Sequence, residues 1–130
     1  MLENMYVRGI IGGIVMLATY LYGSFDGILL ALIAMICIDF ITGIITAAAL
    51  GQVSSQKMFM CGARKVGILL VVAVANVIDG TLVLDGLLRT VTISYFIAHE
   101  GISLLENWSL MGLPVPAKLR NVLAVLGKDK

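Results

Sequence analysis

The stretch ILLALIAMICIDFITGIITAAAL, residues 28–50, decides the fold class, because it holds one charged side chain, Asp39, in an otherwise apolar run. A helix of this length is about 34 Å long at roughly 1.5 Å per residue. The hydrocarbon core of a bilayer is about 30 Å thick. We therefore expect residues 28–50 to cross a membrane with some tilt.

The composition of the whole chain agrees with a membrane environment. The chain has 130 residues, of which 60% are hydrophobic and 13% are charged, and its mean hydropathy is +1.04. Soluble domains have roughly 45–50% apolar and about 25% charged residues. A soluble protein this small could not bury so much apolar surface. These values argue against a soluble enzyme, a disordered tail and a nucleic-acid-binding protein.

Three further stretches are long and apolar enough to suggest spans: residues 7–22, 66–84 and 87–108. The turn signal Asp85-Gly86 separates the last two. The first stretch has a charged start but no small-x-small cleavage site at its end, so we expect a retained helix and no cleaved signal peptide.

The C-terminal part of the chain predicts a different kind of helix. Pro114 and Pro116 cannot continue the fourth span, and residues 117–126 then place leucine and valine on one side and polar residues on the other. This pattern is typical of a helix lying among lipid headgroups. We therefore predict an all-α integral membrane protein, with residues 1–130 forming one membrane domain of four transmembrane helices and a short C-terminal amphipathic interfacial helix.

The distribution of basic residues predicts the orientation. Eight of the nine Lys and Arg residues lie in the N-terminal segment, in residues 51–65 or in the C-terminal segment, whereas the two intervening turns hold none. Because basic loops stay in the cytoplasm, we expect a multi-pass protein of the bacterial cytoplasmic membrane with both termini inside. The residues expected to set this topology are Arg8, Lys57, Arg64, Lys65, Lys118 and Arg120, with Lys128 and Lys130 at the end of the chain.

Polar residues on two of the predicted spans are the candidate functional features. Ionisable groups at membrane depth are costly and usually face protein or water. They therefore line either a subunit contact or an aqueous path, or they form hydrogen bonds between helices of one monomer. The candidate pore-lining or interhelical residues are Asp39, Thr42, Thr46, Asn76, Thr92, His99, Glu100, Ser103, Glu106 and Asn107.

Small residues mark possible helix contacts. Gly9 and Gly13 have the G-x-x-x-G spacing, and Gly43 and Ala47 repeat it on the second span. Such residues let helices approach closely, within one chain or between chains.

No catalytic, cofactor-binding or metal-binding arrangement is present in the sequence. It has no Ser/His/Asp set, no catalytic carboxylate pair and no phosphate-binding loop, and His99 is its single histidine. Cys37 lies in an apolar run and Cys61 in a predicted polar loop, so we expect neither a disulfide nor a metal site. We expect a protein that is not an enzyme.

Several short motifs, taken in order, resemble the phage lysis and toxin-secretion holins of Gram-positive bacteria and their phages. The motifs are Asp39-Phe40-Ile41-Thr42-Gly43, Ser54-Ser55, Gly62-Ala63-Arg64-Lys65, Asn76-Val77-Ile78-Asp79, the run from Glu100 to Asn107, and Gly112-Leu113-Pro114-Val115-Pro116. The chain departs from the pattern at His99, where Asn is usual, and at Cys61, where Gly is usual.

The resemblance implies an inner-membrane protein of a lysis cassette that accumulates, forms homo-oligomers and opens lesions in the bilayer. An endolysin, or in some relatives a large toxin, is then passing cargo and not a tight partner. No cofactor and no nucleic acid are implied.

Three other functions stay open at this point. One is a small four-helix proton-coupled multidrug transporter, which would carry an acidic residue in its first span; residues 7–22 have none, and aromatic residues are scarce at 7%. The second is a small-pore channel. The third is a membrane adaptor that holds a cytoplasmic partner through residues 51–65, although such an adaptor would not need a polar fourth span.

Overall fold

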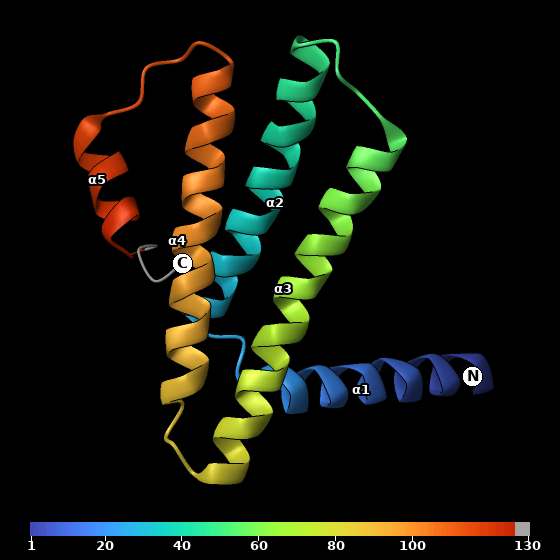
Figure 1. Ribbon diagram of the computed structural model, residues 1–130. Coiled ribbons are helices and arrows are strands. Elements are labelled where there is room, and N and C mark those ends of the chain that lie inside the picture. The colour runs from blue at the N-terminus through green and yellow to red at the C-terminus, as the bar shows by residue number, and fades with distance from the viewer. Residues whose placement is uncertain (127–130) are drawn as a thin grey trace.

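The computed structural model describes residues 1–126, which form helices joined by short turns (Figure 1). Lys128 and Lys130 lie outside the described residues. The helices are α1 (Leu2–Tyr22), α2 (Gly27–Ala49), α3 (Ser55–Leu82), α4 (Leu87–Leu110) and α5 (Ala117–Leu126). Within residues 1–126 there is no strand, so the all-α prediction is confirmed.

A bundle of α2, α3 and α4 forms the core, and α2 and α4 pack most closely in it. The buried apolar side chains that hold the bundle together are Leu29, Leu32, Ile36, Ile68, Val72 and Ile93. The α2–α3 and α4–α5 connections lie at one end, and the α1–α2 and α3–α4 connections lie toward the other (Figure 1). The bundle therefore has two ends with different loops and different charges.

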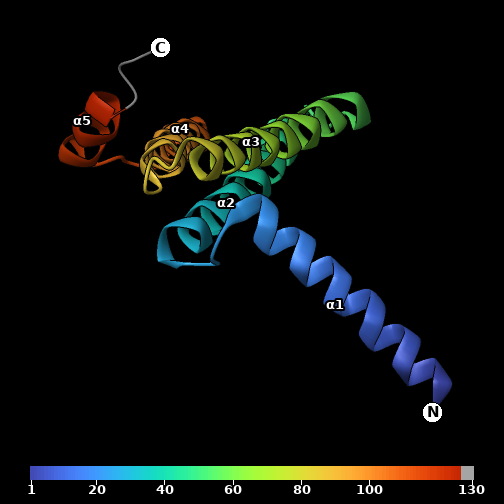
Figure 2. The same cartoon turned by 90° about the horizontal axis from the view of Figure 1, so that it is seen from below.

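Helix α1 stands apart from this bundle. It runs crosswise to the other long helices and projects away from them (Figures 1 and 2), and none of its residues is buried. A Cβ atom added at Gly9 or Gly13 would have no neighbour within 4 Å. The small residues of α1 therefore pack against nothing in the single chain, and their role in helix packing stays a prediction.

By length and composition, three helices are apolar enough to cross a membrane: α1, α2 and α3. Helix α4 is as long as α2, but it carries Arg89, Glu100 and Glu106. These charges lower its hydropathy, so a fourth span stays a prediction. Helix α5 has the predicted bounds, and its interfacial position also stays a prediction.

The third helix differs from the sequence prediction. We expected residues 51–65 to be a loop and 66–84 to be the span, whereas α3 begins at Ser55 and ends at Leu82. The prediction was wrong because it equated polar residues with a loop, although Gln, Lys and Met are good helix formers. Ser54, whose backbone is extended, is the N-cap residue that precedes the helix. As a consequence Cys61 and Lys65 lie on α3.

The other long helices have bounds close to those expected. Helices α2 and α4 begin and end within a few residues of the expected spans 28–50 and 87–108. Helix α1 begins earlier than expected, at Leu2. The turn after α1 depends on Gly23, whose φ of +73° and ψ of −150° are open almost only to glycine.

Candidate functional site

One lysine connects the three helices of the bundle. The Lys65 Nζ atom, from α3, donates to the carboxylates of Asp39 on α2 and Glu100 on α4. Asp39 is 3% exposed and Glu100 is 0% exposed. Two acidic side chains that no water reaches are thus held by a single ammonium group, and this group joins three helices at one point.

Asn107 extends this network along the contact between α2 and α4. Its Nδ2 donates to Asp39 Oδ1 at 3.0 Å and to Thr42 Oγ1 at 3.3 Å. The Thr46 hydroxyl donates to the Asn107 carbonyl oxygen at 3.3 Å. A Cβ atom at Gly43 would lie 3.6 Å from Asn107 Nδ2, so Gly43 allows the side chain of Asn107 to lie against α2.

The electrostatic balance of the network is uneven. One ammonium faces two carboxylates, and the His99 Nδ1 atom lies 3.5 Å from Glu100 Oε1. Among the described residues neither of these two atoms has a hydrogen-bond partner. Removing one partner of a buried ion pair leaves an uncompensated charge in a low-dielectric surrounding. The arrangement therefore depends strongly on Lys65.

The structure brings some of the candidate residues together and separates others. Asp39, Thr42, Thr46, Glu100 and Asn107 contact one another or Lys65 inside one chain. The remaining candidates lie elsewhere: His99 borders the network, Thr92 and Ser103 are half-buried, Glu106 is exposed and Asn76 belongs to a second cluster. A role of any of them in lining an opening stays a prediction.

Lys65 is the network residue that the sequence analysis missed, because we expected it in a loop as a topology signal. A clue was present in the chain. Two carboxylates at membrane depth need a cation, since unpaired charges there are costly. Lys65 is the basic residue nearest to the start of the predicted third span, and it was the natural partner for them.

A second polar cluster lies at the opposite end of the bundle, around Arg89 of α4. Its guanidinium makes a bidentate pair with Asp26, with Nη1–Oδ2 and Nη2–Oδ1 distances of 2.9 and 3.1 Å. It also donates to the carbonyl oxygens of Tyr22 at 2.8 Å and Ser24 at 2.9 Å. The hydrogen bond from Arg89 holds the pKa of the Asp26 carboxyl below its usual value of 3.8.

Asp79 and Asn76 of α3 complete this cluster. The Asp79 carboxylate accepts the backbone N–H groups of Leu88 and Arg89 and so caps the start of α4. Asn76 Nδ2 donates to the Tyr20 carbonyl oxygen at 3.1 Å. Together with the contacts of Arg89, these hydrogen bonds hold the turn between α1 and α2 against the turn between α3 and α4. From the sequence we expect Asn76 to be a pore-lining or interhelical residue, and in the structure it makes an interhelical contact, from α3 to α1.

Within residues 1–126, no group of three or more His, Cys, Asp and Glu side chains is placed to hold a metal ion. Cys37 and Cys61 are both free cysteines.

Comparison with known proteins identifies the family. The model of the bacteriophage holin family matches residues 16–128. The chain belongs to the bacteriophage holin family. A protein of Bacillus phage phi105 named "Probable holin" is 37% identical over 110 residues, which cover 85% of this chain and 81% of the phage protein.

Other relatives of this holin-family protein come from bacterial genomes. An uncharacterized protein of Listeria monocytogenes is 37% identical over 106 residues, or 82% of this chain and 76% of the relative. An uncharacterized 14.9 kDa protein of Clostridium perfringens is 32% identical over 133 residues, or 99% of this chain and 100% of the relative. No solved structure matches the chain.

Family membership agrees with the helical architecture. The holin family is a family of membrane proteins without enzymatic activity, and this member has three helices long and apolar enough to cross a bilayer. Its buried network and its Arg89 cluster both lie within the matched residues. The holin resemblance expected from the ordered motifs is confirmed.

Proposed function

We propose that this protein acts as a holin: it accumulates in the cytoplasmic membrane of a bacterium, forms homo-oligomers and opens the membrane to an endolysin or a large toxin. The observation that carries the proposal is the family match over residues 16–128, supported by the similar phage protein named "Probable holin". The passing enzyme or toxin is cargo, and the lasting contacts are with lipid and with other copies of the chain.

The surface of the single chain supports self-assembly. Helix α1 is apolar and wholly without buried residues, so it meets either lipid or another copy of the protein. The most polar candidate residues, Asp39 and Glu100, are already paired inside one chain. We propose that the Lys65 network holds the closed bundle together, and that an aqueous opening is lined by polar groups that it leaves free, such as Glu106.

For the orientation we propose that both termini lie in the cytoplasm and that α1 to α4 all cross the bilayer. Supporting this, the N-terminal part of α3, which contains Lys57 and Arg64, begins at the end of the bundle where α4 connects to α5 (Figure 1). The turn before α2, which contains Asp26, and the C-terminal part of α3, which contains Asp79, lie toward the other end (Figure 1). Because α1 runs crosswise to the bundle in the structure, this proposal requires α1 to turn into the direction of the other helices.

Reporter fusions test the orientation. A reporter enzyme that is active only outside the cytoplasm is fused after Gly27, after Gln52 and at each terminus, and the activities of the four fusions are compared. The proposal expects external activity at Gly27 alone. An N-terminal fusion active outside, together with an inactive fusion at the C-terminus, would instead place α1 on the outer surface and leave three spans.

The functional test is controlled expression in a bacterium with and without a cytoplasmic endolysin. We expect the membrane potential to collapse abruptly in both strains and the cells to lyse only when the endolysin is present. Cells that keep their potential and gain resistance to cationic drugs would point to a transporter. A loss of ions without endolysin-dependent lysis would point to a small-pore channel.

A further inference from the structure

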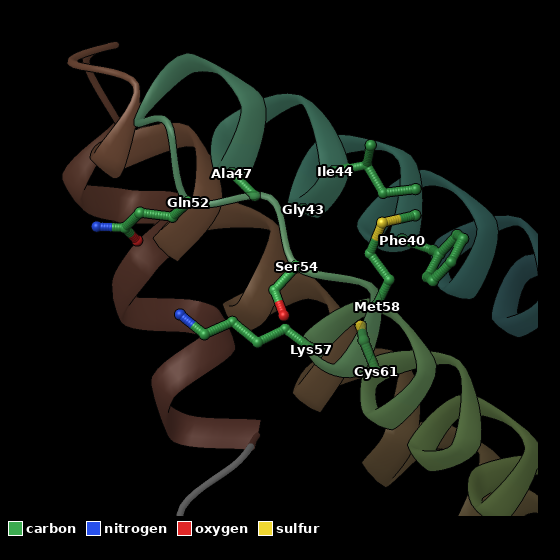
Figure 3. Close-up of a pocket in the computed structure, with 9 residues that line it drawn as sticks. All are labelled: Phe40, Gly43, Ile44, Ala47, Gln52, Ser54, Lys57, Met58 and Cys61. Carbon is green, nitrogen blue, oxygen red and sulfur yellow. The ribbon is translucent and has the colours of Figure 1, made fainter.

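A groove lies between α2 and α3, beside the short loop that joins them (Figure 3). Its volume is about 180 Å³. It is lined by side chains of α2, of α3 and of the loop between them. Because Gly43 and Ala47 have little or no side chain, this part of α2 leaves room that a larger residue would fill.

The two ends of the groove differ in chemistry. Figure 3 shows Phe40, Met58 and Cys61 gathered toward one end, and Gln52, Ser54 and Lys57 toward the other. The polar end lies at the loop between the helices, and the apolar end lies further along α2 and α3. The groove is thus amphipathic along the direction of the helices, as a phospholipid is.

The polar end carries uncompensated positive charge. Residues 50–65 contain no Asp or Glu, and Lys65 is already paired with two carboxylates. Within residues 1–126 the ion pairs leave Lys57 and Arg64 without an acidic partner. Both side chains also line a shallow hollow that adjoins the groove. A negatively charged group is therefore the ligand that this end of α3 favours.

The length of α3 places this charge at the right depth. With 28 residues the helix is about 42 Å long, whereas the hydrocarbon core is about 30 Å thick. Its first turns therefore extend into the headgroup layer when the apolar remainder spans the core. Lys57 then lies at the level of the lipid phosphates, where basic side chains attract anionic lipids.

We propose that this groove is a binding site for an anionic phospholipid. An acyl chain lies along Phe40, Met58 and Cys61, and the phosphate group accepts hydrogen bonds from Lys57 and Ser54. A helix of a second copy fits less well, because it would bring its apolar surface against Lys57. The inference does not depend on the holin role, since it concerns what the closed chain binds in any bilayer.

Native mass spectrometry of the purified protein in detergent tests the site, with phosphatidylglycerol and phosphatidylcholine of equal chain length as probes. The unaltered protein should retain phosphatidylglycerol in preference to phosphatidylcholine. Lys57→Gln should weaken phosphatidylglycerol retention about fivefold, the effect of one basic residue near a membrane surface. Lys118→Gln, on the exposed surface of α5, removes the same charge elsewhere and should have no effect.

A second pair of variants tests the groove itself. Ala47→Phe fills it and should lower the retention of both lipids, whereas Ala48→Phe places the same ring on an exposed position of α2 and should change neither. If Ala47→Phe does not yield folded protein, Met58→Trp fills the groove from α3, at a residue 37% exposed.

Three results would overturn the proposal. Equal retention of the two lipids by the unaltered protein would remove the charge preference. Equal losses in Lys57→Gln and Lys118→Gln would indicate general attraction to the surface. A change of oligomeric state in Ala47→Phe with unchanged lipid retention would show that a second copy of the chain occupies the groove.

Discussion

The Lys65 ammonium group meets two buried carboxylates that come from two other helices. At the scale of single residues this is the most consequential contact in the chain, because each carboxylate relies on the same cation. A buried charge that loses its partner is not rehydrated, and it therefore destabilises the folded state strongly.

We predict that Lys65→Met lowers the free energy of unfolding by about 3–5 kcal/mol, the usual cost of leaving a buried charge unpaired. Reversible unfolding in mixed micelles measures this quantity. Lys57→Met is the matched control, because Lys57 is exposed on the same helix, and it should have little effect. Restored stability in the triple variant that adds Asp39→Asn and Glu100→Gln would confirm the electrostatic cause. Equal losses in the two single variants would contradict it.

The backbone conformation of Gly23 leads to a second prediction for a single residue. Its backbone is in a region that costs other residues about 1–3 kcal/mol, and a Cβ atom there would lie 2.9 Å from Asn76 Oδ1. Gly23→Ala should therefore lower the free energy of unfolding by at least that amount in the same assay. Gly27→Ala, at the first residue of α2, where a Cβ has no neighbour within 4 Å, should not.

The sequence identified Asp39, Glu100 and Asn107 because polar groups in apolar spans are conspicuous. It did not identify their contacts with Lys65 and with each other, since these depend on how α2, α3 and α4 pack. The same limit applies to Arg89. Its pairing with Asp26 depends on two turns far apart in the chain meeting in space.

At the scale of elements, the presence of the helices was easier to predict than their bounds. The apolar run 28–50 and the prolines after α4 determined where helices lie, because periodicity and proline act locally. The start of α3 was mispredicted, since a helix that extends beyond the hydrocarbon core carries polar residues without ending. Hydropathy indicates whether a segment lies in lipid or in water. It does not indicate whether the backbone of residues 55–65 is helical.

The ion pair between Asp26 and Arg89, at the turn between α1 and α2, is expected to make the stability of the fold depend on pH. Arg89 lowers the pKa of Asp26, so the native state favours the ionised carboxylate. The stabilisation from this pair is therefore fully present above the unfolded pKa, near 3.8, and is lost as the pH falls through the lower native pKa.

Thermal unfolding of the unaltered protein and of Asp26→Asn, followed from neutral pH down to pH values below the native pKa, checks this dependence. We expect the unaltered protein to be more stable at neutral pH and the difference to vanish only at the acid end. Asp85→Asn, which alters an exposed carboxyl in the turn between α3 and α4, should show no such convergence. A difference between Asp26→Asn and the unaltered protein that stays constant with pH would mean that the carboxylate charge is not what stabilises this turn.

At the scale of the whole molecule, the chain is a small bundle with an apolar helix that packs on little of it. Three helices suit a bilayer, and the buried side chains of Asp39, Glu100 and Asn107 are engaged in contacts within the chain. One copy therefore cannot enclose a wide aqueous path. The proposed holin function requires many copies, with α1 at their contacts and the free polar side chains of α4 lining the opening.

Release from loaded vesicles tests whether this chain opens a membrane to a folded protein, as we propose. Vesicles that contain both a small dye and a folded fluorescent protein receive the purified chain at rising protein-to-lipid ratios. We expect little release at low ratios and then joint release of dye and protein above a threshold ratio. Escape of the dye alone at every ratio would rule out the holin function and assign the chain to the small-pore channels.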